Sequence, residues 1–374
     1  MTEYRNSQPP ADVFVVGGGP AGIAAALAAR QHGLEVTIAD GCVPPIDKPC
    51  GEGLMPDGVA ALNKLGVRVP VADCQRFRGI RFVNGECSSE ADFPSSCGLG
   101  IRRTVLHQIL IEHAESAGVR FLWQAPVTGL HPDGVLLRGE LHPARWILGA
   151  DGSSSRVRRW AGLDAPNDNN HRFAFRRHYR VAPWSEFMEV HWADHYQLYF
   201  TPVSANEVCV ALISRDPALR LDDALSSFPE MKRRLQGAEH SSTERGGVSM
   251  TRRFARVYKD RIALIGDASG SVDAITGEGL SLAFSQANLL GACLAAGNLA
   301  AYQSGHRKIA RRPAIMSHLM LLLDRHRLIR SRVIRAFAAE PKIFAHMLAT
   351  HVGEVSPLHL AANSLALGWK LVTA

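Results

Sequence analysis

Cysteine is scarce in this sequence, and its placement forms no motif. The seven cysteines among 374 residues are scattered and include no Cys-x-x-Cys pair. This arrangement argues against a disulfide framework and against a thiolate zinc site, and it is typical of proteins from a reducing compartment. We therefore expect a cytoplasmic protein with no bound metal ion.

Long apolar runs are also absent. The most apolar region, residues 277–302, contains Glu278, Ser281 and Gln286, which makes it too polar to span a membrane. It predicts a buried helix instead. Residues 1–10 are polar and lack the basic and apolar segments of a secretory signal. The sequence has no internal repeat and no low-complexity tract, which argues against a solenoid or a fibrous protein.

What the sequence does contain is enough apolar material for a large core. Hydrophobic residues make up 46% of the chain, and its length suggests two or three domains. Lysine and arginine outnumber aspartate and glutamate by 42 to 35, and the resulting net charge of +7 favours anionic ligands. Because no nucleic-acid-binding module accompanies this charge, we expect no nucleic acid partner.

A glycine-rich turn follows the first predicted strand. Residues 12–16, DVFVV, form a short β-branched and aromatic run, and GGGPAG comes directly after it. Gly17, Gly19 and Gly22 have G-x-G-x-x-G spacing and precede an alanine-rich helix predicted at 23–32. Such glycines allow a sharp turn, a close approach to a pyrophosphate and tight helix packing, while the helix N-terminus attracts the anion.

An acidic residue stands where this kind of turn binds a ribose. A second predicted strand, residues 35–39, ends at Asp40, roughly twenty residues after the glycines. A carboxylate at this position accepts hydrogen bonds from a ribose diol and repels a 2′-phosphate. The two features together predict a dinucleotide site and leave open whether the ligand is NAD or FAD.

Two later segments repeat the combination of an apolar strand, a glycine and an aspartate. Residues 146–158, WILGADGSSSRVR, place Asp151 after one strand. Residues 261–280, RIALIGDASGSVDAITGEGL, place Asp267 after another and continue into a buried helix. The carboxyl ends of parallel strands form the ligand-binding edge of open α/β sheets, so Asp267 is well placed to bind a ribityl hydroxyl.

Four segments in this order resemble the flavoprotein superfamily of para-hydroxybenzoate hydroxylase, the geranylgeranyl reductases and the flavin-dependent halogenases. They are GGGPAG, RRTVLHQIL, GADGSSSRVR and GDASGSVDAITGEGL, and they cover about the first 300 residues. The resemblance implies FAD as the cofactor, and Arg103 looks like the family arginine that contacts it, although Arg102 stands beside it. The FAD contacts expected from these motifs are Gly17, Gly19, Pro20, Ala21, Gly22, Asp40, Arg103, Asp151, Gly266, Asp267, Gly277, Gly279 and Leu280.

Residues 48–58 have the sequence KPCGEGLMPDG. Its first six residues, KPCGEG, are similar to the KPCGG element of the geranylgeranyl reductases. Gly51 and Gly53 have no side chains, so the main chain could pass close to a flat ring while Cys50 or Glu52 faces the cavity. We take Cys50 and Glu52 as candidate catalytic residues. A cysteine that merely fills a small apolar space is the alternative for Cys50.

The region from residue 171 to 250 changes character. RFAFRRHYRV, FMEVHWADHYQLYFTPV and EVCVALI alternate side-chain classes with a period of two and predict an antiparallel sheet laid over the flavin. Candidates for lining a pocket for a planar or greasy substrate are Trp192, His195, Tyr196, Tyr199 and Phe200. His195 is a candidate general base, although ordinary packing within a sheet explains any one of these residues as well.

The expected fold class is therefore mixed α/β (α+β). It combines a Rossmann-like FAD-binding domain, an antiparallel β-sheet substrate domain and a C-terminal helical segment. The FAD-binding domain is expected in three parts, 1–75, 96–170 and 251–303, with a substrate-side hairpin at 76–95, the substrate-binding sheet at 171–250 and the helical region at 304–374.

Departures from the family patterns narrow the expected function. The halogenase WxWxIP element is absent, and the loop at 269–273 is closer to the reductases than to the phenol hydroxylases. The main expectation is a monooxygenase that uses NADH or NADPH and dioxygen to hydroxylate a small aromatic or polyketide-like molecule through a flavin C4a-(hydro)peroxide. The alternatives are a flavin reductase of carbon–carbon double bonds, like the geranylgeranyl reductases, and a non-catalytic flavin carrier or sensor.

The C-terminal region is predicted to be helical and basic. From His306 onward, leucine, isoleucine and methionine recur near helical spacing while arginines occupy the other faces. Such helices dock on their own protein or associate weakly with a membrane surface, and the sequence favours docking.

Overall fold

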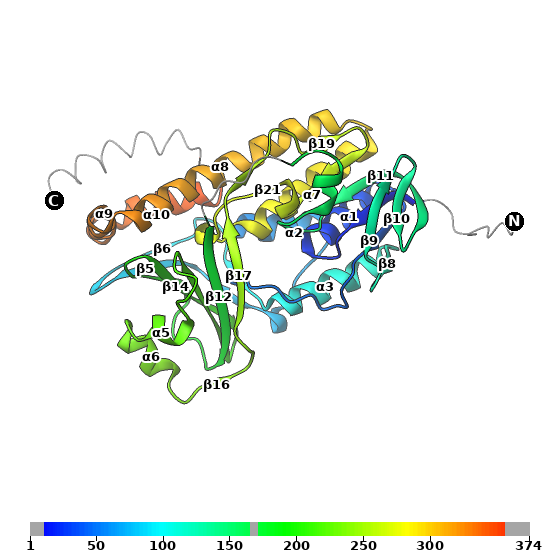
Figure 1. Cartoon of the computed structure of the whole chain (residues 1–374). Coiled ribbons are helices and arrows are strands. Elements are labelled where there is room, and N and C mark those ends of the chain that lie inside the picture. Colours follow the sequence, from blue (N-terminus) through cyan, green and yellow to red (C-terminus); the bar gives the residue numbers. More distant parts are fainter. Residues whose placement is uncertain (1–10, 165–170, 356–374) are drawn as a thin grey trace, which may run out of the picture.

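The computed structural model describes residues 11–164 and 171–355, which form two β-sheets joined along one side by long C-terminal helices (Figure 1). The first sheet has the order β19-β20-β11-β1-β2-β8, and β10 and β9 extend it from β11. Its strands are β1 (Ala11–Val16), β2 (Val36–Ala39), β8 (Arg120–Leu122), β9 (Val127–His131), β10 (Gly134–Leu137), β11 (Glu140–Gly149), β19 (Tyr258–Lys259) and β20 (Ile262–Leu264). β1 pairs in parallel with β2 and β11, and β11 with β20. The carboxyl ends of these strands therefore share one edge.

Helices cover the first sheet and bury its apolar strands. They are α1 (Pro20–Gln31), α2 (Pro56–Lys64), α3 (Arg103–Ser116), α4 (Arg156–Trp160) and α7 (Gly279–Ala295). α1 and α7 lie unusually close together, since a Cβ atom on Gly291 would lie only 2.7 Å from the carbonyl oxygen of Ala28. Alanine and glycine on both helices permit this contact, which ties the two predicted glycine turns to each other.

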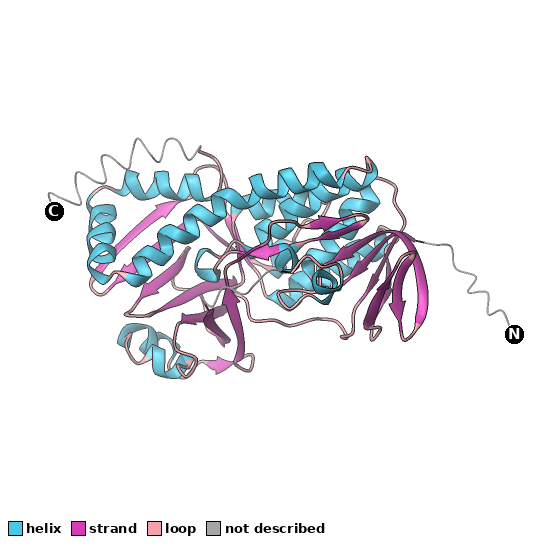
Figure 2. Ribbon diagram, turned by 45° about the horizontal axis from the view of Figure 1, so that its top comes forward, coloured by secondary structure: helices cyan, strands magenta, loops and turns pink. Residues whose placement is uncertain are grey.

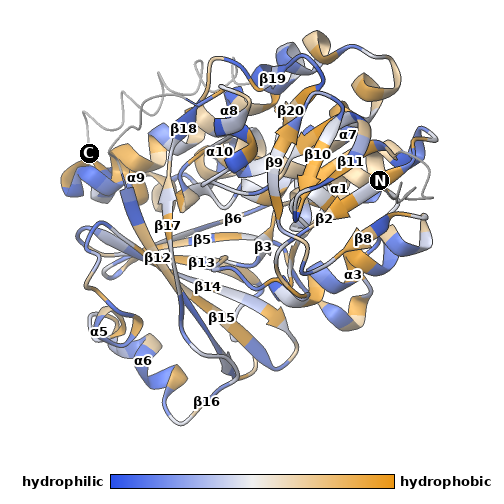
Figure 3. Cartoon of the chain, turned by 45° about the vertical axis from the view of Figure 1, so that its right-hand side comes forward, coloured by the Kyte–Doolittle hydropathy of each residue, from blue (hydrophilic) through white to orange (hydrophobic). Residues whose placement is uncertain are grey.

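The second sheet is antiparallel except for one parallel pair, β5 with β13. Its order is β16-β12-β15-β14-β13-β5-β6, with β17 also paired to β12. The strands are β5 (Gly79–Asn84), β6 (Cys87–Asp92), β12 (His171–Arg180), β13 (Phe187–Trp192), β14 (Tyr196–Ser204), β15 (Glu207–Ser214), β16 (Glu239–His240) and β17 (Arg245–Met250). Two short helices, α5 (Leu221–Leu225) and α6 (Pro229–Leu235), lie beside it (Figure 3). The predicted period-two segments thus form one sheet, and the mixed α/β fold class is confirmed.

Short elements connect the two sheets. β3 (Gly53–Leu54), β7 (Gly98–Gly100) and β4 (Gln75–Phe77) form a small sheet, and β18 (Arg252–Arg253) pairs with β21 (Gly270–Ser271). The 3₁₀ turns are η1 (Val71–Asp73), η2 (Gly266–Ser269) and η3 (Ala274–Thr276). β3 and η3 matter most here, because both lie next to the space between the sheets.

Three helices run along the C-terminal part of the described chain (Figure 2): α8 (Leu299–Arg325), α9 (Arg327–Ala339) and α10 (Pro341–His351). The buried helix predicted within 277–302 is α7, but it is shorter than that region. α7 ends at Ala295, and Gly297, with a φ of 67°, makes the turn into α8. The reversal needs a left-handed residue, which glycine supplies at no steric cost.

The C-terminal helices dock on the second sheet. Phe337 of α9 stacks on Phe344 of α10 with ring centroids 4.9 Å apart, and Phe344 also contacts Phe82 of β5 at 4.8 Å. No helix within the described ranges is long and apolar enough to cross a membrane. Half-exposed apolar side chains remain on α8 and α9, at Ile315, Leu319, Leu322, Leu328 and Ile329. Weak association of these helices with a membrane surface stays a prediction.

We predict that Phe337→Ala will lower the free energy of unfolding by about 3–5 kcal/mol, because it removes a large side chain that is only 1% exposed. Leu328→Ala, in the same helix but 78% exposed, is the matched control and should change it by less than about 0.5 kcal/mol. Urea unfolding followed by circular dichroism measures both. Equal effects of the two substitutions would contradict the docking of α9.

Candidate active site

A cavity of about 320 Å³ lies between the two sheets. Most of the predicted FAD residues line it: Gly19, Pro20 and Ala21 at the start of α1, Arg103 at the start of α3, Gly266 and Asp267 after β20, and Gly277, Gly279 and Leu280 at the start of α7. Cys50 and Glu52 of the KPCGEG loop line it as well. Segments that are more than two hundred residues apart in the chain therefore meet at the shared edge of the parallel strands.

Two helices direct their N-termini at this cavity. α1 and α7 both begin without a side-chain cap. Free N–H groups and the positive end of the helix dipole make such a terminus an anion-binding site. A Cβ atom on Gly19 or Gly279 would meet no other atom within 4 Å, so the space in front of both termini is open.

The other glycines of the first motif have a structural role. A Cβ atom on Gly22 would lie 2.0 Å from the carbonyl oxygen of Gly17. Gly17 itself has a φ of 114°, and its own Cβ would lie 2.5 Å from the carbonyl oxygen of Ala150. Neither Gly17 nor Gly22 belongs to the cavity lining. They let β1, α1 and the turn after β11 approach one another.

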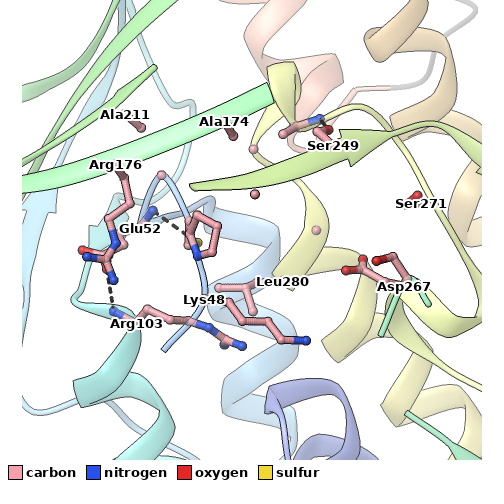
Figure 4. Close-up of a pocket in the computed structure, with 18 of the residues that line it drawn as sticks. Lys48, Glu52, Arg103, Ala174, Arg176, Ala211, Ser249, Asp267, Ser271 and Leu280 are labelled. Carbon is pink, nitrogen blue, oxygen red and sulfur yellow. Dashed lines mark hydrogen bonds and ion pairs between the residues drawn. The ribbon is translucent and has the colours of Figure 1, made fainter. Parts of the chain in front are cut away.

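Charged side chains extend into the cavity from opposite walls. Lys48 and Arg103 reach in from one side, and Asp267 faces them from the other (Figure 4). Desolvation raises the pKa of the Asp267 carboxyl above its ordinary value, although Lys48 and Arg103 act against the shift. Arg103 is 8% exposed, and its Nη1 has no hydrogen-bond partner in the described part of the chain. A ligand with oxygen acceptors and hydroxyl groups would satisfy both residues.

Glu52 fastens the KPCGEG loop to the two domains. Its carboxylate accepts a hydrogen bond from the backbone N–H of Arg103 at 2.9 Å and lies 2.5 Å from Nε2 of His178 on β12. The residue is 3% exposed and has a φ of 60°, which is unusual for a residue with a side chain. Asp47, in the same loop, pairs with Arg176 on the same strand. The loop is thus held at both ends by contacts with Arg176 and His178 of β12.

The predicted catalytic pair therefore divides into two roles. Both carboxylate oxygens of Glu52 are engaged in this network, so the geometry favours a positioning role. Cys50 lines the cavity, and the N–H of Glu52 donates to its Sγ at 3.4 Å. Desolvation raises the pKa of the Cys50 thiol above its ordinary value, outweighing the opposite effect of the Arg103 guanidinium. The thiol is consequently neutral near pH 7.

One cluster has the residue types of a metal site. Ligand atoms of Glu52, His178 and Cys209 all lie within 4.8 Å of one another. The Arg176 guanidinium adjoins this cluster, with Nε 3.9 Å from Glu52 and Nη1 3.4 Å from His178. A fixed positive charge at this distance disfavours a cation, and the cluster satisfies its polar atoms by internal hydrogen bonds.

Two predicted cofactor acids lie outside the cavity lining. Asp40 accepts hydrogen bonds from the backbone N–H groups of Gly18 at 2.7 Å and Cys42 at 2.8 Å. Asp151 accepts from the N–H groups of Arg156 and Val157 at the start of α4. Both carboxylates order the turns that surround the site. Direct contact of either with FAD remains a prediction.

The structure does not bring His195 to the cavity. It is exposed at the turn between β13 and β14, with a φ of 74°, and lies outside the cavity lining. Of the aromatic residues expected to line the pocket, Tyr199 does so, whereas Phe200 packs on the opposite face of β14 against Trp184. Successive side chains of a strand point to opposite faces, so the two neighbours could not both face the substrate.

Sequence reasoning missed three residues of the site. Arg176 and His178 anchor the loop. The third residue is Lys48, which reaches the turn after β11: its Nζ would lie 3.1 Å from a Cβ atom placed on Gly152. The available signal was the series of charged residues with a period of two in RFAFRRHYR, on a strand otherwise predicted to be buried. Buried charges of this kind require partners, which the KPCGEG loop supplies.

Comparison with known proteins identifies the family. A family model described as an FAD binding domain matches residues 10–307. The chain belongs to this family. It is 31% identical to the menaquinone reductase of Mycobacterium tuberculosis over 297 residues, which are 72% of this chain and 73% of that protein.

Other relatives differ in their chemistry. The rifampicin monooxygenase of Streptomyces venezuelae is 26% identical, over 76% of this chain and 64% of that protein. The crystal structure of a flavoprotein/dehydrogenase from Cytophaga hutchinsonii superposes with a TM-score of 0.80 at 18% identity and covers 92% of this chain and 93% of that one. The family and these relatives make the chain an FAD-dependent oxidoreductase.

The residues present fit FAD. Two uncapped helix N-termini suit the pyrophosphate and an electron-rich ring, and the Asp267 carboxyl suits a ribityl hydroxyl. The partnerless Nη1 of Arg103 offers a further donor. Gly19 and Gly279 leave the open space that close approach of the ligand requires.

We predict that Gly19→Ala will abolish tight FAD binding without unfolding the protein. The φ of −74° suits alanine, and a methyl group there meets only the space where the pyrophosphate would approach. Gly22→Ala is the contrasting variant, because its methyl group would collide with the backbone of Gly17 and lower the melting temperature of the apoprotein. Flavin fluorescence titration and thermal melting of the flavin-free proteins measure the two effects. An apoprotein with Gly19→Ala that melts early, or that binds FAD normally, would refute this placement.

Proposed function

We propose that this flavoprotein is a reductase that saturates a carbon–carbon double bond of an apolar, isoprenoid-like substrate, with NADH or NADPH as the electron donor. This places the reductase ahead of the monooxygenase that the sequence had favoured. The observation that carries the proposal is a thiol, Cys50, that lines the same cavity as a mainly apolar set of side chains and belongs to a loop held by Glu52.

The wall of the cavity on the side of the second sheet is mainly apolar. Its apolar members are Ala174, Phe175, Met188, Tyr199, Ala211, Ile213, Val248 and Met250, and its polar side chains are Arg176 and Ser249. The Tyr199 hydroxyl donates to the carbonyl oxygen of Ile275, so its ring rather than its polar group is available to a ligand. Flexible methionines fit irregular apolar chains well. A hydrophobic substrate is thus better matched than a small polar one.

Saturation of a double bond requires a hydride equivalent at one carbon and a proton at the other. Bound FAD supplies the hydride equivalent when it has been reduced. The protein must supply the proton, and a neutral thiol at the cavity can donate it. The N–H of Glu52 and the guanidinium of Arg103 both stabilise the thiolate that remains on Cys50 afterwards. Solvent then returns the proton to sulfur.

Glu52 has a supporting role in this proposal. Its contacts with Arg103 and His178 fix the loop so that the sulfur of Cys50 has one position relative to the ring. The apolar wall excludes water from the reacting carbons. The 31% identity to a menaquinone reductase supports a reductive reaction on a substrate with a quinone or isoprenoid part.

The second candidate is a monooxygenase that uses dioxygen. It is supported by the 26% identity to a rifampicin monooxygenase. The two candidates differ in the product. Reduction adds two hydrogen atoms and proceeds without oxygen, whereas oxygenation adds one oxygen atom and stops when oxygen is removed.

The reaction class is tested by incubating the FAD-loaded protein with NADPH or NADH and a panel of menaquinones, geranylgeranyl lipids and aromatic compounds, with and without oxygen. We expect products heavier by two hydrogen atoms under anaerobic conditions, detected by mass spectrometry. Products heavier by one oxygen atom, formed in air alone, would replace the reductase with the monooxygenase.

Cys50→Ala should lower the rate of double-bond reduction about a hundredfold or more, because the general acid is lost. Reduction of the flavin by NADPH in the absence of substrate should be unchanged. The reductive rate of the wild type should also fall as pH rises through the raised pKa of the Cys50 thiol, since only the protonated form donates. Cys97→Ala, at an exposed cysteine, is the control and should leave both rates unaltered. Full reductase activity in Cys50→Ala would remove the thiol from the reaction.

A further inference from the structure

Glu278 occupies an unusual position behind the flavin cavity. Its neighbours Gly277 and Gly279 are both exposed on the cavity side, whereas Glu278 between them is 1% exposed. Neither of its carboxylate oxygens has a hydrogen-bond partner in the described part of the chain. The closest cationic nitrogens are Nη2 of Arg312 at 3.9 Å and Nδ1 of His351 at 3.8 Å, both beyond hydrogen-bond distance. Burial of a carboxylate with such weak compensation is costly, so this group favours its neutral form.

A second carboxylate competes for the same cation. Asp57, in the first turn of α2, pairs directly with Nη2 of Arg312, the atom that lies nearest to Glu278. His351 gives no compensating charge, because desolvation lowers its pKa to about 4. Two acids therefore face one guanidinium in the interior, and their mutual repulsion is relieved when one of them carries a proton.

We propose that Asp57 and Glu278 hold one proton between them at neutral pH, mainly on Glu278, and that this buried pair is a proton site coupled to the charge on the flavin. The inference rests on FAD binding and is independent of the proposed reductase activity. It assigns Glu278 a positioning role, in which its charge acts on the cavity through the N-terminus of α7.

The charge on the pair changes in a definite direction with pH. Desolvation raises the pKa of Glu278 to about 8; Arg312 opposes the shift, Asp57 adds to it, and a weak contact with the Thr276 hydroxyl opposes it slightly. Below this pH the carboxyl is neutral and leaves the positive N-terminus of α7 unopposed. Above it the carboxylate cancels part of that potential and disfavours extra negative charge in the cavity. When electrons arrive at the ring above this pH, one proton from solvent is bound by the Glu278 carboxylate.

The cluster also has a route to solvent. The side chains of Asp57 and Arg312 are 19% and 27% exposed, so protons can exchange on the outer side of the pair. Arg312 lies in α8 and His351 in α10, both beyond residues 10–307 that match the family model. The C-terminal helices therefore contribute directly to the surroundings of the cofactor.

The test is the midpoint potential of the bound flavin, measured against reference dyes at about two pH units below and above the Glu278 pKa of about 8. The wild type and Glu278→Gln should have equal potentials at the lower pH. At the higher pH the midpoint potential of the wild type should be lower than that of Glu278→Gln. The difference should be about 30 mV for each tenfold by which the wild type loses affinity for reduced flavin relative to oxidised flavin. Parallel pH profiles for the two proteins would overturn the proposal. Substrate turnover does not enter this measurement, so a failed reductase assay leaves it intact.

Two further variants shift the transition in opposite directions. Asp57→Asn removes the competing carboxylate and frees Arg312. The pH at which the slope of midpoint potential against pH changes, the break, should therefore be lower in this variant. Arg312→Met removes the cation and should move it to higher pH. If Glu278→Gln does not retain FAD, these shifts still decide the matter, and breaks that stay in place in both variants would refute the proton pair. Flavin content and thermal melting confirm that each variant is folded.

Discussion

The close packing of α1 on α7 is the constraint on which the site depends. These helices begin at glycine turns more than two hundred residues apart, and the site needs both N-termini to point into one cavity. Small residues make this possible, since Gly291 lies against the backbone at Ala28 with no room for a side chain. Two aligned dipoles then give a fixed positive potential at the carboxyl edge of the sheet, which needs no mobile side chain to meet an anionic ligand.

At another wall of the cavity, contacts with β12 fix the position of the KPCGEG loop. The KPCGEG loop holds Glu52 in a left-handed conformation, and ion pairs of Asp47 and Glu52 with Arg176 of β12 keep the loop in place. These pairs are buried and contribute little net stability. Their effect is to give Cys50 a single position at the junction of the two sheets, beside the cavity.

The C-terminal helices link stability to the chemistry of the cavity. Phe337 and Phe344 fix α9 and α10 on the second sheet, while Arg312 of α8 reaches the back of the first domain. A region that has no motif of its own thus places Arg312 and His351 beside Glu278. The same helices leave Leu328 and its neighbours exposed, so one apolar face is buried and another remains on the surface.

The sequence by itself determined the glycine turns and the presence of a dinucleotide site, because backbone conformation at Gly17 and the order of strand, turn and acid are local properties. The choice of FAD came from the resemblance of four motifs to a flavoprotein superfamily. The sequence also placed the substrate sheet, from the period-two alternation of β12 to β15. Only the tertiary structure decided which side chains meet. It moved His195 to an exposed turn, joined Glu52 to His178 across 126 positions and buried Glu278 against two C-terminal helices. Such contacts depend on packing between distant segments, for which the local sequence carries no signal.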